Sequence, residues 1–301
     1  MKEFDLEKIK KDLSLYEPWD KYYEYRYQEY KILFFLIDKY FNKNNIEMLS
    51  NSILEIGTGI GFTSVLLSQR FNFVDTVDLL EESGESHSLG EKKIKDFLSY
   101  FDNKHINFQA GDARNLYLYK DKQFNCVYSS QVLEHIPVED RHLSLKEMAR
   151  VLQDDGYCII TVPSFMERVY YVFWYYGVYS FQLVYKKFLV KKKKSFKKYN
   201  SKAKNVDKKP RKKKRFFIPK PHGEYKSSVQ EFYYHLPFMW KKEIQKYFVI
   251  KHICCHKLSV PLSTPFFLPI YNKLSFIDKY FGDKFPFKYF GRTIVFICKK
   301  I

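Results

Sequence analysis

The sequence has five cysteines, and no two of them form a CxxC pair. Four of the five lie in apolar, strand-like runs, where cysteine behaves as a small buried hydrophobic residue. The best candidate for a metal cluster is the run from His252 to His256, but neighbouring side chains of a strand point to opposite faces. The sequence therefore predicts buried cysteines and no metal site.

Long apolar runs are missing as well. Residues 1–11 are charged and have no apolar core, so we expect no secretory signal. Residues 169–185 carry no charge, but this run of 17 is shorter than the roughly 20 apolar residues that span a bilayer. We therefore expect a cytoplasmic protein that can lie on the inner face of the membrane but does not cross it.

Outside one segment, the chain has little net charge. Residues 186–215 hold 17 Lys or Arg against the single acid Asp207, a formal +16 of the chain's +18. The basic run follows residues 169–185, which include six tyrosines and a tryptophan. An aromatic segment beside a polybasic one suits an anionic membrane surface through residues 165–215. A solvated loop and, less in keeping with the pattern, a nucleic-acid contact are the alternatives.

The most informative stretch is residues 52–61, Ser-Ile-Leu-Glu-Ile-Gly-Thr-Gly-Ile-Gly. Residues 53–56 are typical of a buried strand and residues 62–69 of a helix, and the turn between them has glycine at every second position. Glycine allows positive φ and lets the backbone approach a ligand closely. We therefore expect a ligand to lie over this turn.

Two residues distinguish the turn from a dinucleotide site. Such sites have the pattern GxGxxG, whereas Phe62 occupies the position of the third glycine here. Glu55, just before the turn, would repel a pyrophosphate and suits a cationic amino acid moiety. With these residues, the stretch resembles motif I of the class I S-adenosylmethionine-dependent methyltransferases.

The resemblance implies an α/β fold and a cofactor. The fold would be Rossmann-like and doubly wound, with a seven-stranded, mostly parallel sheet, an antiparallel last strand, and an aromatic and basic insertion after strand five. The implied cofactor is S-adenosylmethionine. The residues of the turn that would bind it are Glu55, Gly57, Thr58, Gly59 and Gly61.

Acids follow the next two predicted strands. Asp78 lies 21 residues beyond Gly57 at the end of the second strand, where a carboxylate can accept both ribose hydroxyls, and Leu79 is beside it. Asp112 ends the third strand, where the family holds the adenine amino group, and the N–H of Ala113 would donate to the ring. In register with the turn, these acids strengthen the resemblance.

The predicted fourth strand, residues 124–130, ends at Ser130, which we assign to the cofactor site. The segment after it, residues 131–137, resembles the motif IV segment that lines the methyl-transfer site of small-molecule methyltransferases. An acceptor hydroxyl needs a base, and histidine has a suitable pKa. His135 is the first candidate and His222 the second, although either could simply hydrogen-bond its own loop.

We expect four parts along the chain. These are a helical cap (1–50), a cofactor-binding core (51–164), a partly disordered insertion (165–221) and a C-terminal part that completes the sheet (222–301). The core would include a turn at 153–156, and the C-terminal part a helix at 228–240. An apolar loop at 259–269 would form a lid, which favours a lipid-like or otherwise hydrophobic acceptor.

Other methyltransferase classes are tested by the same residues. The Asn/Asp-Pro-Pro-aromatic tetrad of adenine and cytosine N-methyltransferases of DNA is replaced by Ser129, Ser130, Gln131 and Val132, and the chain contains no Pro-Cys pair for cytosine carbon methylation. We expect methylation of a small or lipid-linked acceptor, at oxygen. RNA methylation through the basic insertion and a non-catalytic scaffold role remain alternatives.

Overall fold

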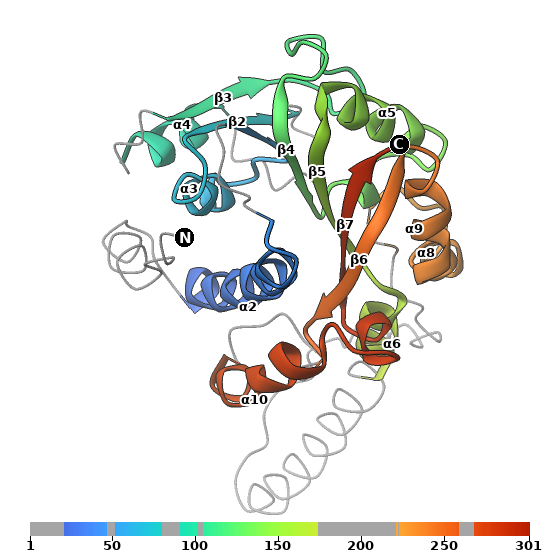
Figure 1. Cartoon of the computed structure of the whole chain (residues 1–301). Helices are drawn as coiled ribbons and strands as arrows, with labels where there is room; N and C mark the ends of the chain where they lie inside the picture. Colours follow the sequence, from blue (N-terminus) through green and yellow to red (C-terminus); the bar gives the residue numbers. More distant parts are fainter. Residues whose placement is uncertain are drawn as a thin grey trace, which may run out of the picture.

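The structure is a computed structural model that describes residues 21–46, 52–79, 91–100, 105–173, 221, 223–258 and 268–301 (Figure 1). Its centre is a seven-stranded sheet with the order β3-β2-β1-β4-β5-β7-β6. The strands are β1 (Ser52–Ile56), β2 (Phe73–Asp78), β3 (Ile106–Ala110), β4 (Phe124–Ser130), β5 (Leu152–Pro163), β6 (Phe248–His256) and β7 (Thr293–Lys300).

The pairing of the strands confirms the predicted sheet. β1 is parallel to both β2 and β4, β3 is parallel to β2, and β5 is parallel to β4. Only β7 runs the other way, antiparallel to both β5 and β6. The carboxyl ends of β1 to β6 therefore meet at one edge, and the strand order reverses between β1 and β4. Open α/β sheets bind ligands in the crevice at such a reversal.

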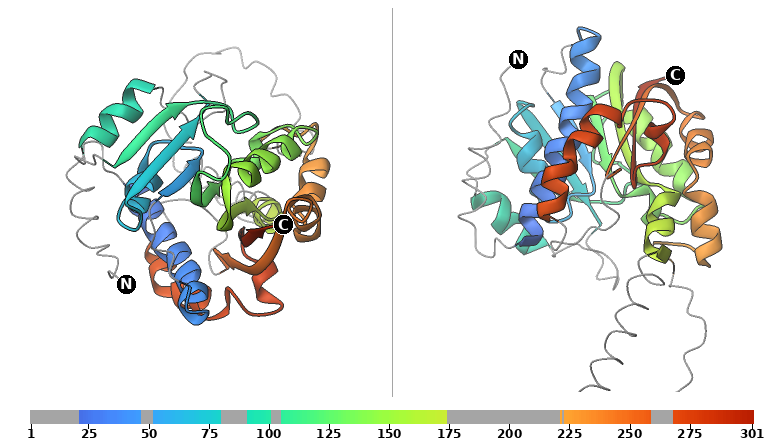
Figure 2. Two further views of the ribbon diagram at one scale, coloured as in Figure 1. Left: turned by 45° about the horizontal axis from the view of Figure 1, so that its top comes forward. Right: turned by 90° about the horizontal axis from the view of Figure 1, so that it is seen from below.

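Helices cover both faces of the sheet (Figures 1 and 2). The first face carries α2 (Lys21–Lys43), α3 (Phe62–Leu67) and α4 (Glu91–Tyr100), and α10 (Leu268–Phe281) packs along α2. The second face carries α5 (Arg141–Val151) and α9 (Pro237–Ile244). The remaining described helices are α6 (Phe165–Phe173), α8 (Ser228–Tyr234) and the short 3₁₀ helices η1 (Leu133–His135) and η4 (Phe287–Tyr289).

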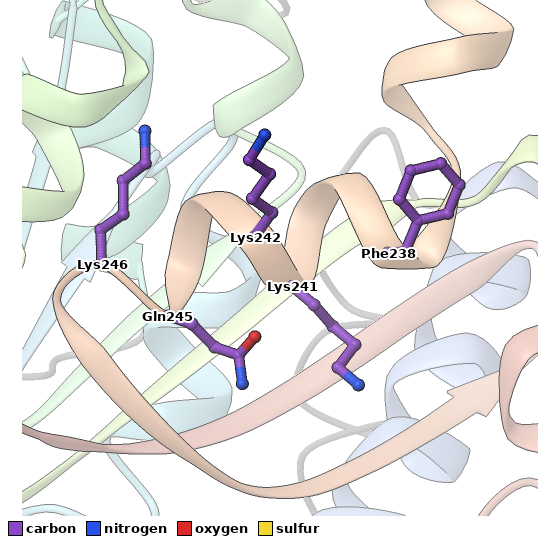
Figure 3. A pocket seen from close by; sticks show the side chains of 5 residues that line it. All are labelled: Phe238, Lys241, Lys242, Gln245 and Lys246. Carbon is purple, nitrogen blue, oxygen red and sulfur yellow. The ribbon is translucent and has the colours of Figure 1, made fainter.

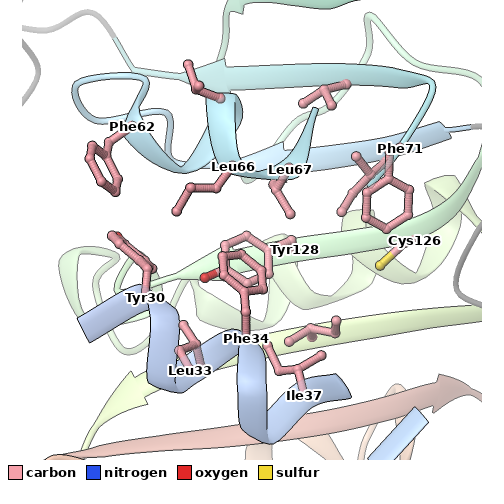
Figure 4. Close-up of a cluster of buried hydrophobic side chains, with 14 of the residues drawn as sticks. Tyr30, Leu33, Phe34, Ile37, Phe62, Leu66, Leu67, Phe71, Cys126 and Tyr128 are labelled. Carbon is pink, nitrogen blue, oxygen red and sulfur yellow. The ribbon is translucent and has the colours of Figure 1, made fainter. Parts of the chain in front are cut away.

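Aromatic side chains fix α2 over the first face. Tyr30 stacks on Phe62 at a centroid distance of 5.6 Å, and Phe34 stacks on Tyr128 of β4 at 6.2 Å (Figure 4). Full burial of such a side chain contributes about 1.5–3 kcal/mol. Side chains alternate along a strand, so Cys126 and Tyr128 face α2, whereas Val127 faces the second core.

Two predicted boundaries were wrong. The single helix predicted at 228–240 is two helices, α8 and α9, because Pro237 has no N–H to donate and forces Leu236 into an extended conformation. The turn predicted at 153–156 belongs to β5, which begins at Leu152 and absorbs the extra residues in a bulge opposite β4. The second error lies at the amino end of β5, away from the carboxyl edge of the sheet.

Of the predicted insertion, the structure describes only residues 165–173, as α6, and residue 221. Most of the predicted lid loop also lies outside the described residues, so the lid and the four-part division of the chain stay predictions. No helix within the described ranges is long and apolar enough to cross a membrane.

Candidate active site

The glycine turn after β1 adopts left-handed backbone conformations, with φ of 87° at Gly57, 55° at Gly59 and 85° at Gly61. A Cβ on Gly57 would overlap the side chain of Val132, and one on Gly61 would lie 3.0 Å from the side chains behind it in α4. Among the described residues, a Cβ on Gly59 would meet nothing within 4 Å. Packing thus disfavours a side chain at 57 and 61, whereas the backbone of Gly59 borders space that no described residue fills.

Asp78 lies beside this open part of the turn. The N–H of Gly59 donates to Asp78 Oδ2 at 2.6 Å, and the N–H of Gly57 donates to the Val77 carbonyl at 2.8 Å. Burial raises the pKa of Asp78, although backbone hydrogen bonds from Gly59 and Leu79 oppose the shift. The turn after β1 and the carboxylate at the end of β2 therefore lie together, next to the strand-order reversal.

Asp112 lies next to Asp78 at the same edge, because the Gly111 N–H donates to the Asp78 carbonyl at 3.0 Å. Its carboxylate accepts from Arg114 Nη2 at 2.6 Å, and Arg114 also reaches Asp140 at 3.0 Å. Burial raises the pKa of Asp112, but the hydrogen bonds from Arg114 outweigh it and hold the pKa below its ordinary value. The sequence analysis missed Arg114, whose only signal is its position two residues after the acid. Ala113, between Asp112 and Arg114 in the sequence, is half-buried.

Glu55 is buried beneath the turn. Ser64 Oγ donates to Glu55 Oε2, and Thr76 Oγ1 donates to the same oxygen at 2.8 Å. Thr76 also shares a 2.7 Å hydrogen bond with Thr58. Burial raises the pKa of Glu55 to about 8, so the group is mostly protonated at neutral pH. A cationic ligand would lower this pKa and so favour the negative charge that the sequence predicted.

The end of β4 leads into η1, which carries His135. Ser130 Oγ is 2.9 Å from Thr161 Oγ1 on β5, and Gln131 adopts a positive φ of 56° as the chain turns. His135 is half-buried, and Glu134 beside it is buried. Burial raises the pKa of Glu134 to about 8. Sequence reasoning had not singled out this acid, although its place beside a candidate base after a strand was a usable signal.

Arg141, at the start of α5, holds η1 in place. Its Nε donates to the carbonyls of Leu133 and Ile136, at 2.8 and 3.2 Å. Its Nη2 donates to the Tyr225 hydroxyl at 2.6 Å, across 84 positions of sequence. The guanidinium is fully buried and lies 4.7 Å from the ring centroid of Trp240. No sequence pattern could have identified these contacts of Arg141, because the residues involved come together only in the folded chain.

The chain that follows the insertion also contacts η1. The N–H of Glu224 donates to the Glu134 carbonyl at 3.2 Å. Gly223 has a φ of 75°, and a Cβ there would overlap the same carbonyl. The structure thus brings position 223 against the helix that carries His135. His222 itself lies outside the described residues.

A shallow pocket of about 370 Å³ lies on α9 rather than at the glycine turn (Figure 3). Phe238, Lys241, Lys242, Gln245 and Lys246 line it. Its three lysines would repel a sulfonium cation. No group of three metal-ligating side chains comes together within the described ranges.

Comparison with known proteins agrees with the motifs. The family described as "Methyltransferase domain" matches residues 54–160. None of the curated proteins matches the sequence. Similar solved structures include the YcgJ protein of Bacillus subtilis, with 22% identity over 39% of this chain and 47% of that one and a TM-score of 0.34. Another is the PH0226 protein of Pyrococcus horikoshii OT3, with 15% identity over 83% and 82% of the two chains and a TM-score of 0.45.

A third is a putative sarcosine dimethylglycine methyltransferase of Galdieria sulphuraria, with 18% identity over 44% of this chain and 45% of that one and a TM-score of 0.36. This chain thus spans about half the length of the Bacillus and Galdieria proteins. Scores at this level say nothing about substrate. The match to the family and the ordered motifs identify residues 54–160 as an S-adenosylmethionine-dependent methyltransferase domain of class I.

Proposed function

We propose that the protein transfers a methyl group from S-adenosylmethionine to a small or lipid-like acceptor, at an oxygen atom. The observation that carries the proposal is the space beside Gly59 that no described residue fills, next to the point where the strand order reverses. The Gly59 N–H also donates to the Asp78 carboxylate at the end of the neighbouring strand β2. A ligand can therefore contact the bare backbone of the turn and the carboxylate at the same time.

The residues at this edge fit the parts of the cofactor. Asp78 would accept the ribose hydroxyls, Asp112 and the Ala113 N–H would hold the adenine, and Leu79 would pack beside them. Glu55, the turn residues Gly57, Thr58, Gly59 and Gly61, and Ser130 would hold the amino acid end. When bound, S-adenosylmethionine supplies an electrophilic methyl group. The chain binds and orients the reactants, which is the main contribution to such displacements.

His135 is our candidate for the base that takes the proton of an acceptor hydroxyl. It follows β4 directly, and its helix is held at both ends by Arg141. Glu134, its neighbour in sequence, is buried, and burial raises the pKa of this acid to about 8. His222 is the second candidate, since its neighbour Gly223 packs on η1.

A lipid-like acceptor is supported by the sequence around the insertion. The uncharged, aromatic residues 169–185 precede the polybasic run at 186–215. Each basic residue near an anionic membrane contributes on the order of 1 kcal/mol to binding, so the run could hold the enzyme at its substrate.

The test is to incubate the protein with methyl-labelled S-adenosylmethionine and, separately, total lipid extract or total RNA. We expect label in the lipid fraction, and we expect His135→Gln to abolish it without changing the affinity for S-adenosylhomocysteine. Label in RNA alone would support RNA methylation instead. Failure to bind S-adenosylhomocysteine would indicate a scaffold.

A further inference from the structure

The segment from α10 to Phe290, which includes η4, carries five exposed aromatic side chains. Their exposed fractions are 59% for Phe276, 64% for Tyr280, 79% for Phe285, and 44% for both Phe287 and Phe290. Single exposed apolar residues are common on proteins, but a group of them marks an interaction site. We call these five residues the aromatic surface.

Contacts between neighbouring elements link parts of this surface. Lys284 Nζ lies 5.5 Å from the ring centroid of Tyr280, which links the end of α10 to the turn before η4. The ring centroids of Phe281 in α10 and Phe287 in η4 are 5.1 Å apart. Phe290 lies 6.3 Å from Phe165 of α6. The aromatic surface therefore extends to α6, the helix in which the uncharged residues 169–185 begin.

The charge of this region is positive. Lysines are interleaved with the aromatic residues, at positions 273, 279, 284 and 288. Asp278 is buried and accepts from the Leu258 N–H at 2.6 Å. Asp283 pairs with Lys39 at 2.8 Å. Both acids in this stretch thus have partners within the described structure, which leaves the lysines as its exposed charge.

We infer that the aromatic surface docks on an anionic membrane. Phenyl rings can enter the boundary between head groups and acyl chains while lysines reach lipid phosphates from flexible stems. Four of the five aromatic residues are phenylalanine, which has no polar atom to satisfy in that boundary. Residues 273–290 contain no arginine, the residue that best combines phosphate pairing with stacking on bases, so RNA is the less suited partner.

This inference goes beyond the proposed methyl transfer and does not depend on it. It adds a second element to the membrane contact proposed for residues 165–215. The first residues of that region form α6, which contacts the aromatic surface through Phe165 and Phe290.

Flotation of the full-length protein with vesicles tests the inference. One set of vesicles contains phosphatidylcholine and phosphatidylglycerol, and the other contains phosphatidylcholine alone. The test variant is Phe276→Gln/Tyr280→Gln, because glutamine is polar and keeps the helix propensity of α10. The matched control is Tyr233→Gln/Phe238→Gln, which removes two exposed aromatic residues from α8 and α9.

We expect the test variant to bind the anionic vesicles at least tenfold more weakly than the wild type, and the control variant to change less than twofold. Lys273→Gln/Lys284→Gln should lower binding to anionic vesicles only, by roughly fivefold for each lysine. The inference is overturned if the wild type does not float with anionic vesicles or if the test variant floats unchanged. It is also overturned if the test and control variants lose vesicle binding to the same extent.

Two further measurements distinguish a membrane partner from a nucleic acid and from a loss of folding. Retention of single-stranded RNA by the same variants identifies the partner, since loss of RNA binding with unchanged flotation would assign the aromatic surface to nucleic acid. Titration with S-adenosylhomocysteine should give equal affinities for the wild type and all three variants. A variant that lost both activities would be misfolded, and Phe285→Gln would then replace it.

Discussion

Two halves of the carboxyl edge of the sheet are built in different ways. In the half formed by β1 and β2, backbone N–H groups of the glycine turn donate to Asp78 and to the Val77 carbonyl, within about twenty positions of sequence. In the half formed by β4, α5 and the C-terminal part, Arg141 joins η1 to Tyr225 across 84 positions. The first half is a local motif, whereas the second exists only once the chain has folded.

The buried polar groups of the two halves differ in the same way. Glu55, under the turn, is neutralised by a proton and bonded to hydroxyls from neighbouring elements. The Arg141 guanidinium is enclosed by carbonyls and aromatic rings. Mutations at Gly59 and Asp78 in the first half should therefore chiefly lower ligand binding, whereas mutations in the second half should chiefly lower stability.

The largest effect is expected for Arg141→Met. The change leaves the carbonyls of Leu133 and Ile136 and the Tyr225 hydroxyl without their donor. A buried polar group without a partner costs about 1–3 kcal/mol, so the free energy of unfolding should fall by roughly 3–5 kcal/mol. Urea unfolding measures this loss of free energy. Lys242→Met, on the exposed side of α9, should stay within about 0.5 kcal/mol of the wild type. A loss below about 1 kcal/mol in Arg141→Met would show that η1 is held by other contacts.

The next effect is the pH dependence caused by Glu55. Its pKa rises from 4.5 to about 8 on folding, so the folded state binds the proton more tightly than the unfolded state. The resulting stability is fully present below pH 4.5 and is lost as the pH rises toward 8. Glu55→Gln should flatten the fall in unfolding free energy by about 1 kcal/mol per pH unit in this window. Urea midpoints at a series of pH values test this, and an unchanged slope would mean that Glu55 is ionised in the fold.

A smaller effect, on binding alone, is expected for Asp78→Asn. The amide can accept only part of what the carboxylate accepts, so affinity for S-adenosylhomocysteine should fall about 10- to 100-fold, or roughly 1.4–2.7 kcal/mol. Asp75→Asn is the control on the same strand, where the side chain bonds to Asn107 at 2.6 Å. Equal affinities for the Asp78 and Asp75 variants would remove Asp78 from the cofactor site.

The smallest effect is expected for Tyr225→Phe, which deletes only the hydroxyl between Arg141 and His235. The loss should be about 1 kcal/mol, and amide hydrogen exchange in η1 should become faster. Tyr233→Phe, on the exposed side of α8, should change neither quantity. Unchanged exchange in η1 would separate Tyr225 from the position of His135.

How far the sequence predicted the molecule follows from the same difference between the halves. The mostly parallel sheet and the antiparallel β7 were predicted because the motifs that carry the family resemblance are local runs of hydrophobic residues and spaced glycines. Asp78 and Asp112 were placed at one edge because parallel neighbours end together. Their roles as cofactor ligands, like those of the turn residues, remain predictions.

The remaining features depend on contacts between distant residues. Protonation of Glu55 depends on how deeply the turn is buried, and the role of Arg141 depends on aromatic rings from α8 and α9. Arg114 competes for Asp112 through an ion pair that the motif does not specify. The break between α8 and α9 is the exception, because Pro237 could have predicted it from the sequence alone.

The central claim is that a ligand of the S-adenosylmethionine type lies against Gly59. Calorimetric titration of the wild type and of Gly59→Val with S-adenosylhomocysteine tests it most directly. Valine at a positive φ should cost about 1–2 kcal/mol of stability, but its side chain would fill the open space and lower the affinity at least 100-fold. A wild type that does not bind, or a valine variant that binds equally well, would contradict the account.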